Sequence, residues 1–529
     1  MKKTLVNLLS LLALSSLFTL TSCQKEQMGN GTQFRATMEG CTAKDGKTAL
    51  NGKSLNWVEG DQIVVYGDAG CGLYTATPQT PATVAVFNNV SGETGDAPFR
   101  AYYPSTLTTD GVNITLPATQ TYVEGSINKF PMYAESANNQ LSFRNLCGVL
   151  KLHLTKANTN ISAITITTNT EANGTYNIDY NNGDPALTLV GNGTNTTTLE
   201  CTTAQSITNG KDFYIYLPAT VDSVKSIMLT TDNGMICTKT VKASSHIGID
   251  RNTITDVTLG ENDLVFRPIG SKGGLFTINA NGDQVWFSQG NLQYQASTDT
   301  WRFAENQYDI VGSDNNNISS AYNGWIDLFG WGTSGYNHGA IAYQPWSTST
   351  TYTNYHAYGN STYSLSDQSG QADWGYNAIS NGGNQENLWY TMTRNEWYYM
   401  IYTRLTSSGI RYAKATVNNI SGVILLPDNW NSTYHALNNT NNSSAAFSSN
   451  NIDAMTWRND FESHGAVFLP TAGRRWGTNA DDMNCCFYWS STPYGQSSAI
   501  GIFFSSSWIS IDYYTGRNVG HSVRLVRTN

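Results

Sequence analysis

Apolar and polar residues alternate over short stretches of this chain, and few stretches repeat with the spacing of an amphipathic helix. Residues 63–66, 149–154, 163–166 and 213–217 are examples, separated by segments rich in Gly, Asn and Asp. Period-two alternation interrupted by such turn residues is typical of β-strands. Many short strands with few helices favour β-sandwiches, so we expect a mainly β fold in which helices are scarce.

Residues 387–404 depart from this pattern and predict a helix. Thr393 can cap its first turn, and Glu396 stands three residues later, as a capping box requires. Apolar residues at i, i+3 and i+4 then share one face of that helix. They are Trp397, Met400 and Ile401. We interpret this face as part of a core rather than as a binding site.

The first 23 residues have the order of an export signal. Lys2 and Lys3 precede a mostly apolar run, residues 5–20, which is too short to span a bilayer. Residues 20–23, Leu-Thr-Ser-Cys, resemble a bacterial lipobox, which implies cleavage before Cys23 and lipid on its thiol. Cys23 is therefore the predicted lipidation site, and outer-membrane lipid is the predicted membrane contact. A plain signal peptide with an incidental cysteine is the alternative.

Composition changes sharply near residue 265. Only Lys272 and Lys414 of 15 lysines follow it, and only Trp57 of 14 tryptophans precedes it. Two unlike architectures are therefore fused, with residues 260–263 as the expected linker. The predicted parts are a signal peptide (1–22), a lipidated linker (23–33), two β-sandwiches (34–140 and 141–260) and a C-terminal domain (268–529).

Charge and cysteine content narrow the function classes. The net charge is −9, only 13% of residues are charged, and no basic patch occurs, which argues against nucleic acid as a partner. No cysteine or histidine spacing suggests zinc. Seven cysteines remain once Cys23 carries lipid, so at least one thiol stays unpaired. We expect Cys485 and Cys486 to be ordinary buried thiols, because joining neighbours would form a strained ring.

Several segments of the first half resemble fimbrillin-family pilins and related anchored lipoproteins. They are residues 34–39, 47–48, 57–63, 142–150 and 252–257, of which 57–61 is the most specific. The resemblance implies two tandem transthyretin-like β-sandwiches and a role in fimbriae or surface adhesion. It also implies fimbrial subunits as partners through donor-strand exchange, in which an extended segment of one subunit fills a groove in the next. Because a further domain follows residue 260, no loose C-terminal strand is left to donate. We therefore expect a tip or accessory position, or a stand-alone lipoprotein.

The second half resembles the FISUMP-like branch of C-type-lectin-like domains. Residues 393–397, 468–475, 488–492 and 520–526 carry the resemblance, which implies an α+β domain over 268–529. Formylglycine-generating enzymes share that fold, but they need reactive cysteines close to the terminal motif, whereas 485–486 precede it. We therefore expect no enzyme. Residues 344–346 and 457–460 only echo the calcium-binding motifs of lectins, so we assign no metal and no cofactor.

The segment 494–521 has the composition of a binding surface. Tyr, Ser, Gly and Asn fill 14 of its 28 positions, as in antibody paratopes, where Tyr supplies rigid contact area and small polar residues adapt. Alternation along residues 500–505 and 509–512 places one set of side chains in the core and the other on an exposed sheet face. The predicted ligand-binding residues are Tyr494, Gly495, Ser497, Ser498, Phe503, Ser505, Ser507, Trp508, Ser510, Asp512, Tyr513, Tyr514, Asn518 and His521.

The same segment is similar to the variable region of diversity-generating-retroelement proteins. Such systems mutate adenines, so the resemblance implies that an Asn codon can become any codon that ends in C or T. Codons of this kind do not encode Trp, Met, Gln, Lys or Glu. Only Gln496 and Trp508 lie outside this set between residues 494 and 521. The sequence therefore predicts a cell-surface adhesin that binds a protein or glycan on a cell or phage surface. A glycan-binding lipoprotein of a nutrient-uptake system is the main alternative, and a formylglycine-generating-like enzyme is a more distant one.

Overall fold

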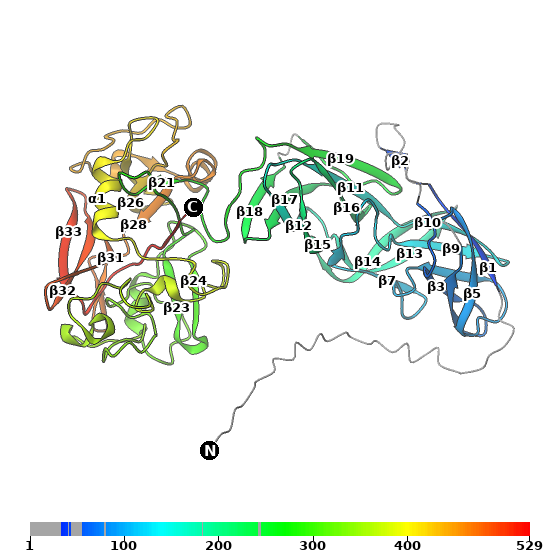
Figure 1. Cartoon of the computed structure of the whole chain (residues 1–529), viewed down its shortest axis with the longest axis horizontal. Coiled ribbons are helices and arrows are strands. Elements are labelled where there is room, and N and C mark those ends of the chain that lie inside the picture. The colour runs from blue at the N-terminus through cyan, green and yellow to red at the C-terminus, as the bar shows by residue number, and fades with distance from the viewer. Residues whose placement is uncertain are drawn as a thin grey trace, which may run out of the picture. The chain divides into compact units, whose positions relative to one another are not determined.

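The computed structural model describes residues 33–40, 42–43, 55–78, 81–181, 183–241 and 245–528. It divides into two compact units, Met1–Asn233 with Cys237–Val265, and Gly234–Ile236 with Phe266–Asn529 (Figure 1). The main division therefore falls where the composition of the sequence changes. Both units are built mainly of strands, which confirms the predicted mainly β fold. The predicted signal peptide, Cys23 and the linker before residue 33 lie outside the described residues.

A closed sheet forms the first part of the first unit. Its strand β1 (Phe34–Met38) is paired on both edges, in parallel with β10 and antiparallel with β5, so the sheet closes into a barrel instead of two separate layers. Trp57 is fully buried in its core, with its ring edge-on to Phe87 at 4.9 Å and Tyr103 at 5.1 Å. The other barrel strands, in order, are β10 (Gln140–Asn145), β9 (Met132–Ser136), β6 (Phe99–Tyr103), β3 (Gln62–Tyr66), β4 (Cys71–Ala76) and β5 (Val84–Gly92).

Three further sheets complete the first unit. The alternation along β11 (Cys147–Leu154) buries Leu152 and Leu154, while Lys151 before them pairs with Asp212 and Asp256. One sheet has the order β16 (Lys211–Pro218), β11, β19 (Thr253–Leu259), β2 (Thr42–Ala43). The second contains β18 (Met235–Thr240), β17 (Val224–Thr231), β12 (Asn160–Thr168), β15 (Thr196–Ser206) and β8 (Thr119–Thr121), and the third β14 (Asp184–Thr194), β13 (Asn173–Asn181) and β7 (Asn113–Leu116).

The second unit consists of small sheets joined by long irregular segments. Residues 304–393 contain short 3-10 turns but no strand. The sheets are β21 (Phe276–Thr277), β22 (Gln284–Phe287), β35 (Val526–Thr528); β23 (Leu292–Gln295), β24 (Thr300–Phe303); β27 (Asn451–Ile452), β25 (Tyr412–Val417), β26 (Ile420–Leu425), β28 (Val467–Pro470); β30 (Asn479–Asp481), β29 (Arg474–Trp476), β34 (Val519–Gly520); and β31 (Cys486–Tyr494), β32 (Ser498–Phe504), β33 (Ile509–Gly516).

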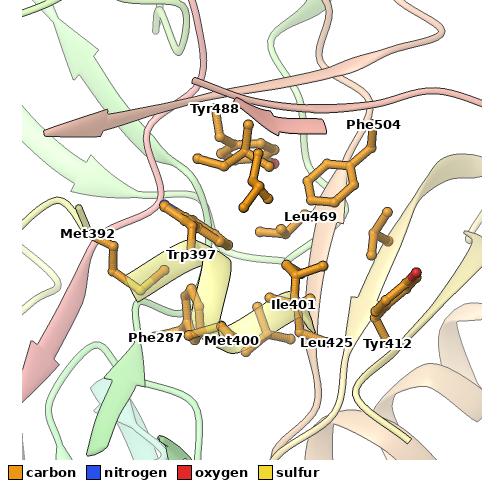
Figure 2. Packing of buried hydrophobic residues seen from close by; sticks show 14 of the residues in the cluster. Phe287, Met392, Trp397, Met400, Ile401, Tyr412, Leu425, Leu469, Tyr488 and Phe504 are labelled. Carbon is orange, nitrogen blue, oxygen red and sulfur yellow. The ribbon is translucent and has the colours of Figure 1, made fainter. Parts of the chain in front are cut away.

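The predicted helix is present and is shorter than its pattern suggested. Its α-helical part, α1 (Arg394–Tyr398), continues as a π-helical turn, η7 (Tyr399–Thr403). Thr393 and Glu396 form the predicted capping box. The predicted apolar face packs in the core of the unit beside Phe287 and Tyr488 (Figure 2), which confirms the interpretation as core. Its members are Trp397, Met400 and Ile401.

Four arginines of the second unit are almost fully buried. Three of them donate mainly to backbone carbonyls, whereas Arg524 donates to side-chain amide oxygens. Arg475 donates to Leu328 O, Gly477 O and Ser347 O, and so ties together segments far apart in the sequence. Burial lowers its pKa to about 10, which leaves it charged at neutral pH. A buried cation without hydrogen-bond partners is costly, so the segments that supply these partners are held close to each guanidinium group. The buried arginines thereby fix the path of the irregular segments. The four residues are Arg404, Arg475, Arg517 and Arg524.

The cysteine pair of the second unit is not joined. Cys485 and Cys486 are both free thiols, as predicted, but Cys485 is half-buried and not buried as expected. Cys486 is fully buried, its thiol lies 3.4 Å from Leu469 O, and burial raises its pKa well above 9.0. Such a thiol is protonated at neutral pH and therefore unreactive. Cys71 of the first unit is disulfide-bonded.

We expect Arg475→Ala to destabilise the second unit by about 3 kcal/mol, because it leaves buried carbonyls without donors and opens a cavity. Differential scanning calorimetry of the full-length protein would measure the shift. Arg458→Ala is the matched control, since Arg458 is an exposed arginine of the same unit. Equal transition temperatures for both variants would contradict the role given to the buried guanidinium group.

Candidate functional site

The predicted binding segment forms a three-stranded antiparallel sheet, β31-β32-β33. Register places Tyr488 beside Ile502 and Cys486 beside Phe504, and all four belong to the core of the second unit. Ile509 and Ile511 of β33 join the same core. The predicted alternation therefore holds over this part of the hairpin. Ile500 is only half-buried, contrary to the pattern, because a register shift between Gly501 and Phe503 interrupts the alternation, and Ile500 pairs with the exposed Tyr514.

The opposite face of the sheet carries a row of aromatic rings, which we call the aromatic row. Phe503 lies at its centre, with ring centroids 5.0 Å from Phe487, 5.1 Å from Tyr513 and 5.4 Å from Trp508. The guanidinium group of Arg474 lies 5.6 Å from the Phe487 ring. Phe503 and Tyr513 are half-buried, whereas Trp508 at the end of the row is 50% exposed.

A second group of rings, the tyrosine pair, consists of Tyr494 and Tyr514. Their rings stack at 4.6 Å with 19° between the planes, and they are 49% and 61% exposed. Tyr514 follows Tyr513 directly, and consecutive strand residues point to opposite faces. The sequence predicted one exposed face, but the register divides its aromatic residues between two sides of the sheet.

An ion pair links α1 to the strand that carries Tyr514. Arg394 Nε and Nη2 donate to the two carboxylate oxygens of Asp512 at 2.6 and 2.8 Å. This hydrogen bonding lowers the pKa of Asp512. The same guanidinium group lies 5.0 Å from the ring of Tyr398. Asp512, predicted as a ligand-binding residue, is thus exposed but already engaged in a bidentate contact.

Hydrogen bonds from side chains beneath it fix the backbone of the turn between β31 and β32. Arg517 donates to Ser498 O at 2.9 Å and to Gly495 O at 3.2 Å, and its guanidinium group lies 4.5 Å from the ring of Trp331. His356 Nε2 donates to Gln496 O at 2.8 Å. Buried and half-buried donors therefore fix the backbone of the turn, and the exposed side chains on it start from a rigid base.

The turn between β32 and β33 is fixed in the same way. Ser505 Oγ accepts hydrogen bonds from the backbone of Ser507 and Trp508, both at 3.3 Å. Lys414, which is buried, donates to Ser505 O at 2.7 Å. Burial lowers the pKa of this lysine to about 8. Trp508 is therefore displayed at the end of a constrained loop.

The prediction that Asn518 and His521 contact the ligand is wrong, because both residues are buried. Their side chains are 2% and 0% exposed. His521 lies between the rings of Phe487 at 5.1 Å and Trp489 at 4.2 Å. The chain leaves the exposed sheet after Gly516 and re-enters the core, although its composition does not change there. The predicted residues that are exposed or half-exposed are Tyr494, Gly495, Ser497, Ser498, Phe503, Ser505, Ser507, Trp508, Ser510, Asp512, Tyr513 and Tyr514.

Other residues of the site were not predicted. Phe487 completes the aromatic row, Arg394 engages Asp512, and Arg517 holds the turn. The alternation of Phe487 with Cys486 and Tyr488 could have identified the first as a residue of the opposite face. The two arginines act across 118 residues and 22 residues of sequence, so no local pattern reveals their partners.

Within the described ranges, no group of three His, Cys, Asp or Glu side chains is placed to hold a metal ion. None of the helices described there is both long and apolar enough to cross a membrane. The candidate site is a surface of rings, hydroxyl groups and backbone amides, which suits non-covalent binding.

Comparison with known proteins returned structural neighbours only. No family model matches the chain, and no curated protein matches it. A putative cell adhesion protein from Bacteroides uniformis has 18% identity and a TM-score of 0.27, and the alignment covers 45% of this chain and 97% of that one. A fimbrial protein from Bacteroides ovatus has 9% identity and a TM-score of 0.23, over 95% of this chain and 100% of that one.

The tip fimbrial protein Mfa3 from Porphyromonas gingivalis, with a C-terminal truncation, is a third neighbour. It has 10% identity and a TM-score of 0.21, and the alignment covers 45% of this chain and 98% of that one. The neighbours are thus fimbrial and putative cell adhesion proteins. TM-scores below 0.5 establish neither a common fold nor a common function.

We expect the stability of the second unit to fall as pH drops below about 6.5, through His521. Burial, with a smaller effect of the Arg474 cation, lowers its pKa from 6.5 to about 3. The unfolded state therefore binds the proton first, and stability decreases between pH 6.5 and 3 by up to about 1.4 kcal/mol per unit. Urea unfolding at a series of pH values would measure the slope.

The matched variant is His521→Phe, which keeps a ring between Phe487 and Trp489 without a titratable group. It should flatten the slope over that pH window. The other groups that face His521 are the Arg474 cation and the ring of Tyr513, whose centroid lies 6.3 Å away. An unchanged slope in the variant would mean that His521 does not dominate the acid response.

Proposed function

We propose that this protein is a cell-surface adhesin, a fimbrial tip or accessory subunit, whose second unit binds its ligand through the sheet β31-β32-β33. The observation that carries the proposal is the display of Tyr494, Trp508 and Tyr514 on turns and strands held by buried donors. Large exposed rings on a rigid backbone lose little entropy on binding, which is why they dominate binding hot spots.

The chemistry of the surface favours an uncharged ligand face. Asp512 and Arg394 neutralise each other within the site. The remaining predicted positions offer hydroxyl groups, among them Ser497, Ser498 and Ser510, which can donate and accept hydrogen bonds. A protein or glycan on a cell or phage surface fits this combination of ring faces and neutral polar groups.

The location and partners in this proposal come from sequence resemblance. Cys23 would carry lipid and tether the chain to the outer membrane, and the first unit would dock to fimbrial subunits through donor-strand exchange. We include in the same proposal that a retroelement diversifies residues 494–521. Exposed positions such as Ser507 and Tyr514 would tolerate exchange, since few core contacts depend on them.

We expect at least one of Tyr514→Ala and Trp508→Ala, whose rings lie on opposite sides of the sheet, to weaken ligand binding by about tenfold or more, because exposed aromatic rings carry much of the energy of an interface. The transition temperature should stay unchanged, since both side chains are at least half exposed. Adhesion of cells that display the full-length protein to target cells would provide the readout.

Tyr352→Ala is the matched control, as Tyr352 is 47% exposed in the same unit but lies outside the sheet. It should adhere like the wild type. The proposal fails if the sheet variants retain adhesion, or if Tyr352→Ala loses it to the same extent. Tyr513→Ala should in addition lower stability, because Tyr513 packs on Phe503 and Phe487.

We expect Cys23→Ala to release the chain from the membrane, because removal of the thiol prevents acylation. Fractionation of cells, with metabolic labelling by a palmitate analogue, would measure both effects. A wild-type chain without label, found in the soluble fraction, would contradict lipid anchoring.

A further inference from the structure

A cleft in the second unit lies apart from the sheet β31-β32-β33. It is bordered by β23, the start of β24 and the irregular segments near residues 335, 345 and 376, and its volume is about 630 Å³. This volume falls within the range of about 300–1,000 Å³ that is usual for small-molecule sites. None of the ligand-binding residues predicted from the sequence lines it.

Aromatic rings form one wall of the cleft. Tyr294 lies between Trp301, at 4.5 Å, and Trp346, at 6.1 Å with only 25° between the ring planes. Tyr294 and Trp301 are buried, whereas Trp346 is half-buried, so of these three rings Trp346 is the most available to a ligand. Tyr336, which also lines the cleft, is 44% exposed. The cleft thus offers flat aromatic surfaces to a ligand.

Amide and carboxylate side chains line the same cleft. Asn377 Nδ2 donates to Ser334 O at 2.9 Å and to Trp374 O at 3.2 Å, which fixes the amide and leaves its oxygen as an acceptor. Within the part of the chain that the structure describes, the side chains of Gln344 and Glu386 make no hydrogen bond or ion pair. The amide of Gln344 can therefore donate to and accept from a ligand, and the carboxylate of Glu386 can accept from it.

The charges around the cleft exclude one large class of ligands. No Lys or Arg lines it, while Asp299 and Glu386 do. Phosphate, sulfate and carboxylate ligands need cationic or backbone-amide partners, and the two carboxylates would repel them. Asp299 is in part committed, since it accepts a hydrogen bond from Tyr294 Oη at 2.8 Å.

Hydrogen bonds within the protein preorganise the walls of the cleft for binding. Trp374 Nε1 donates to Thr333 O at 3.0 Å, and Ser334 Oγ donates to Gln371 O at 2.7 Å. Gly335, whose φ is +90°, donates its backbone N–H to Tyr343 O and brings residues 343–346 to the cleft. A site ordered in this way loses little entropy on binding.

We propose that this cleft binds a neutral oligosaccharide. The C–H face of a sugar ring packs on a flat aromatic side chain, and its hydroxyl groups pair with amide and carboxylate groups, which is the combination that Trp346, Gln344, Asn377 and Glu386 present. The inference is independent of the proposed function, because it rests on other residues and stands whether or not the sheet β31-β32-β33 binds a ligand.

Isothermal titration of the full-length protein with a panel of neutral gluco-, galacto-, manno- and xylo-oligosaccharides tests this site. At least one neutral compound should bind, and the anionic sialyllactose should not. Trp346→Ala should weaken the binding by about tenfold or more, as expected for loss of the main stacking surface. Gln344→Ala should weaken it several-fold without a change in transition temperature, because its amide has no partner within the described chain.

Two control variants test whether the sugar binds in this cleft and not elsewhere on the second unit. Trp325→Ala removes a half-buried tryptophan that packs against Arg302 outside the cleft, and it should bind the sugar like the wild type. Tyr514→Ala, which tests the proposed function, should also leave sugar binding unchanged. The inference is overturned if no neutral oligosaccharide binds, if sialyllactose binds instead, or if Gln344→Ala and a folded Trp346→Ala retain full affinity.

Discussion

The second unit depends on buried guanidinium groups that hold backbone carbonyls. Its irregular segments have few neighbouring strands to satisfy their polar backbone, and a buried carbonyl without a donor is as costly as a lost hydrogen bond. Arg475 and Arg517 each offer several fixed donors and reach carbonyls on segments more than 100 residues away. The same hydrogen bonds stabilise the positive charge of the buried guanidinium group. Removing one of these side chains therefore leaves carbonyls without donors and loosens the loops that they belong to.

Buried hydrogen-bond donors also explain how the second unit, which has little regular secondary structure, holds exposed side chains in fixed positions. Arg517 and His356 fix one turn of the sheet β31-β32-β33, and Lys414 fixes the other. The cleft around Trp346 is built on segments that indole and serine donors tie together. In both surfaces the side chains stand on a fixed, hydrogen-bonded support, so a change of side chain there need not disturb the fold.

The two surfaces differ in what they can recognise. The sheet offers exposed rings, such as Tyr514 and Trp508, that suit a large partner which supplies its own complementary shape. The cleft surrounds its ligand with Trp346 and amide groups, which suits a small flexible chain of hydroxylated rings. An adhesin with both would contact a glycosylated surface in two chemically distinct ways, and each contact would raise the effective concentration for the other.

The sequence by itself determined the mainly β architecture, the change of composition near residue 265, the capping box at Thr393 and the core side of the strands from 502 to 511, because these depend on local periodicity and on neighbouring residues. Only the tertiary structure decided that Tyr513 and Tyr514 serve opposite faces, that Asn518 and His521 are buried, and that Trp346 borders a cleft. Those outcomes depend on register and on contacts between segments far apart in the chain, and composition carries no information about either.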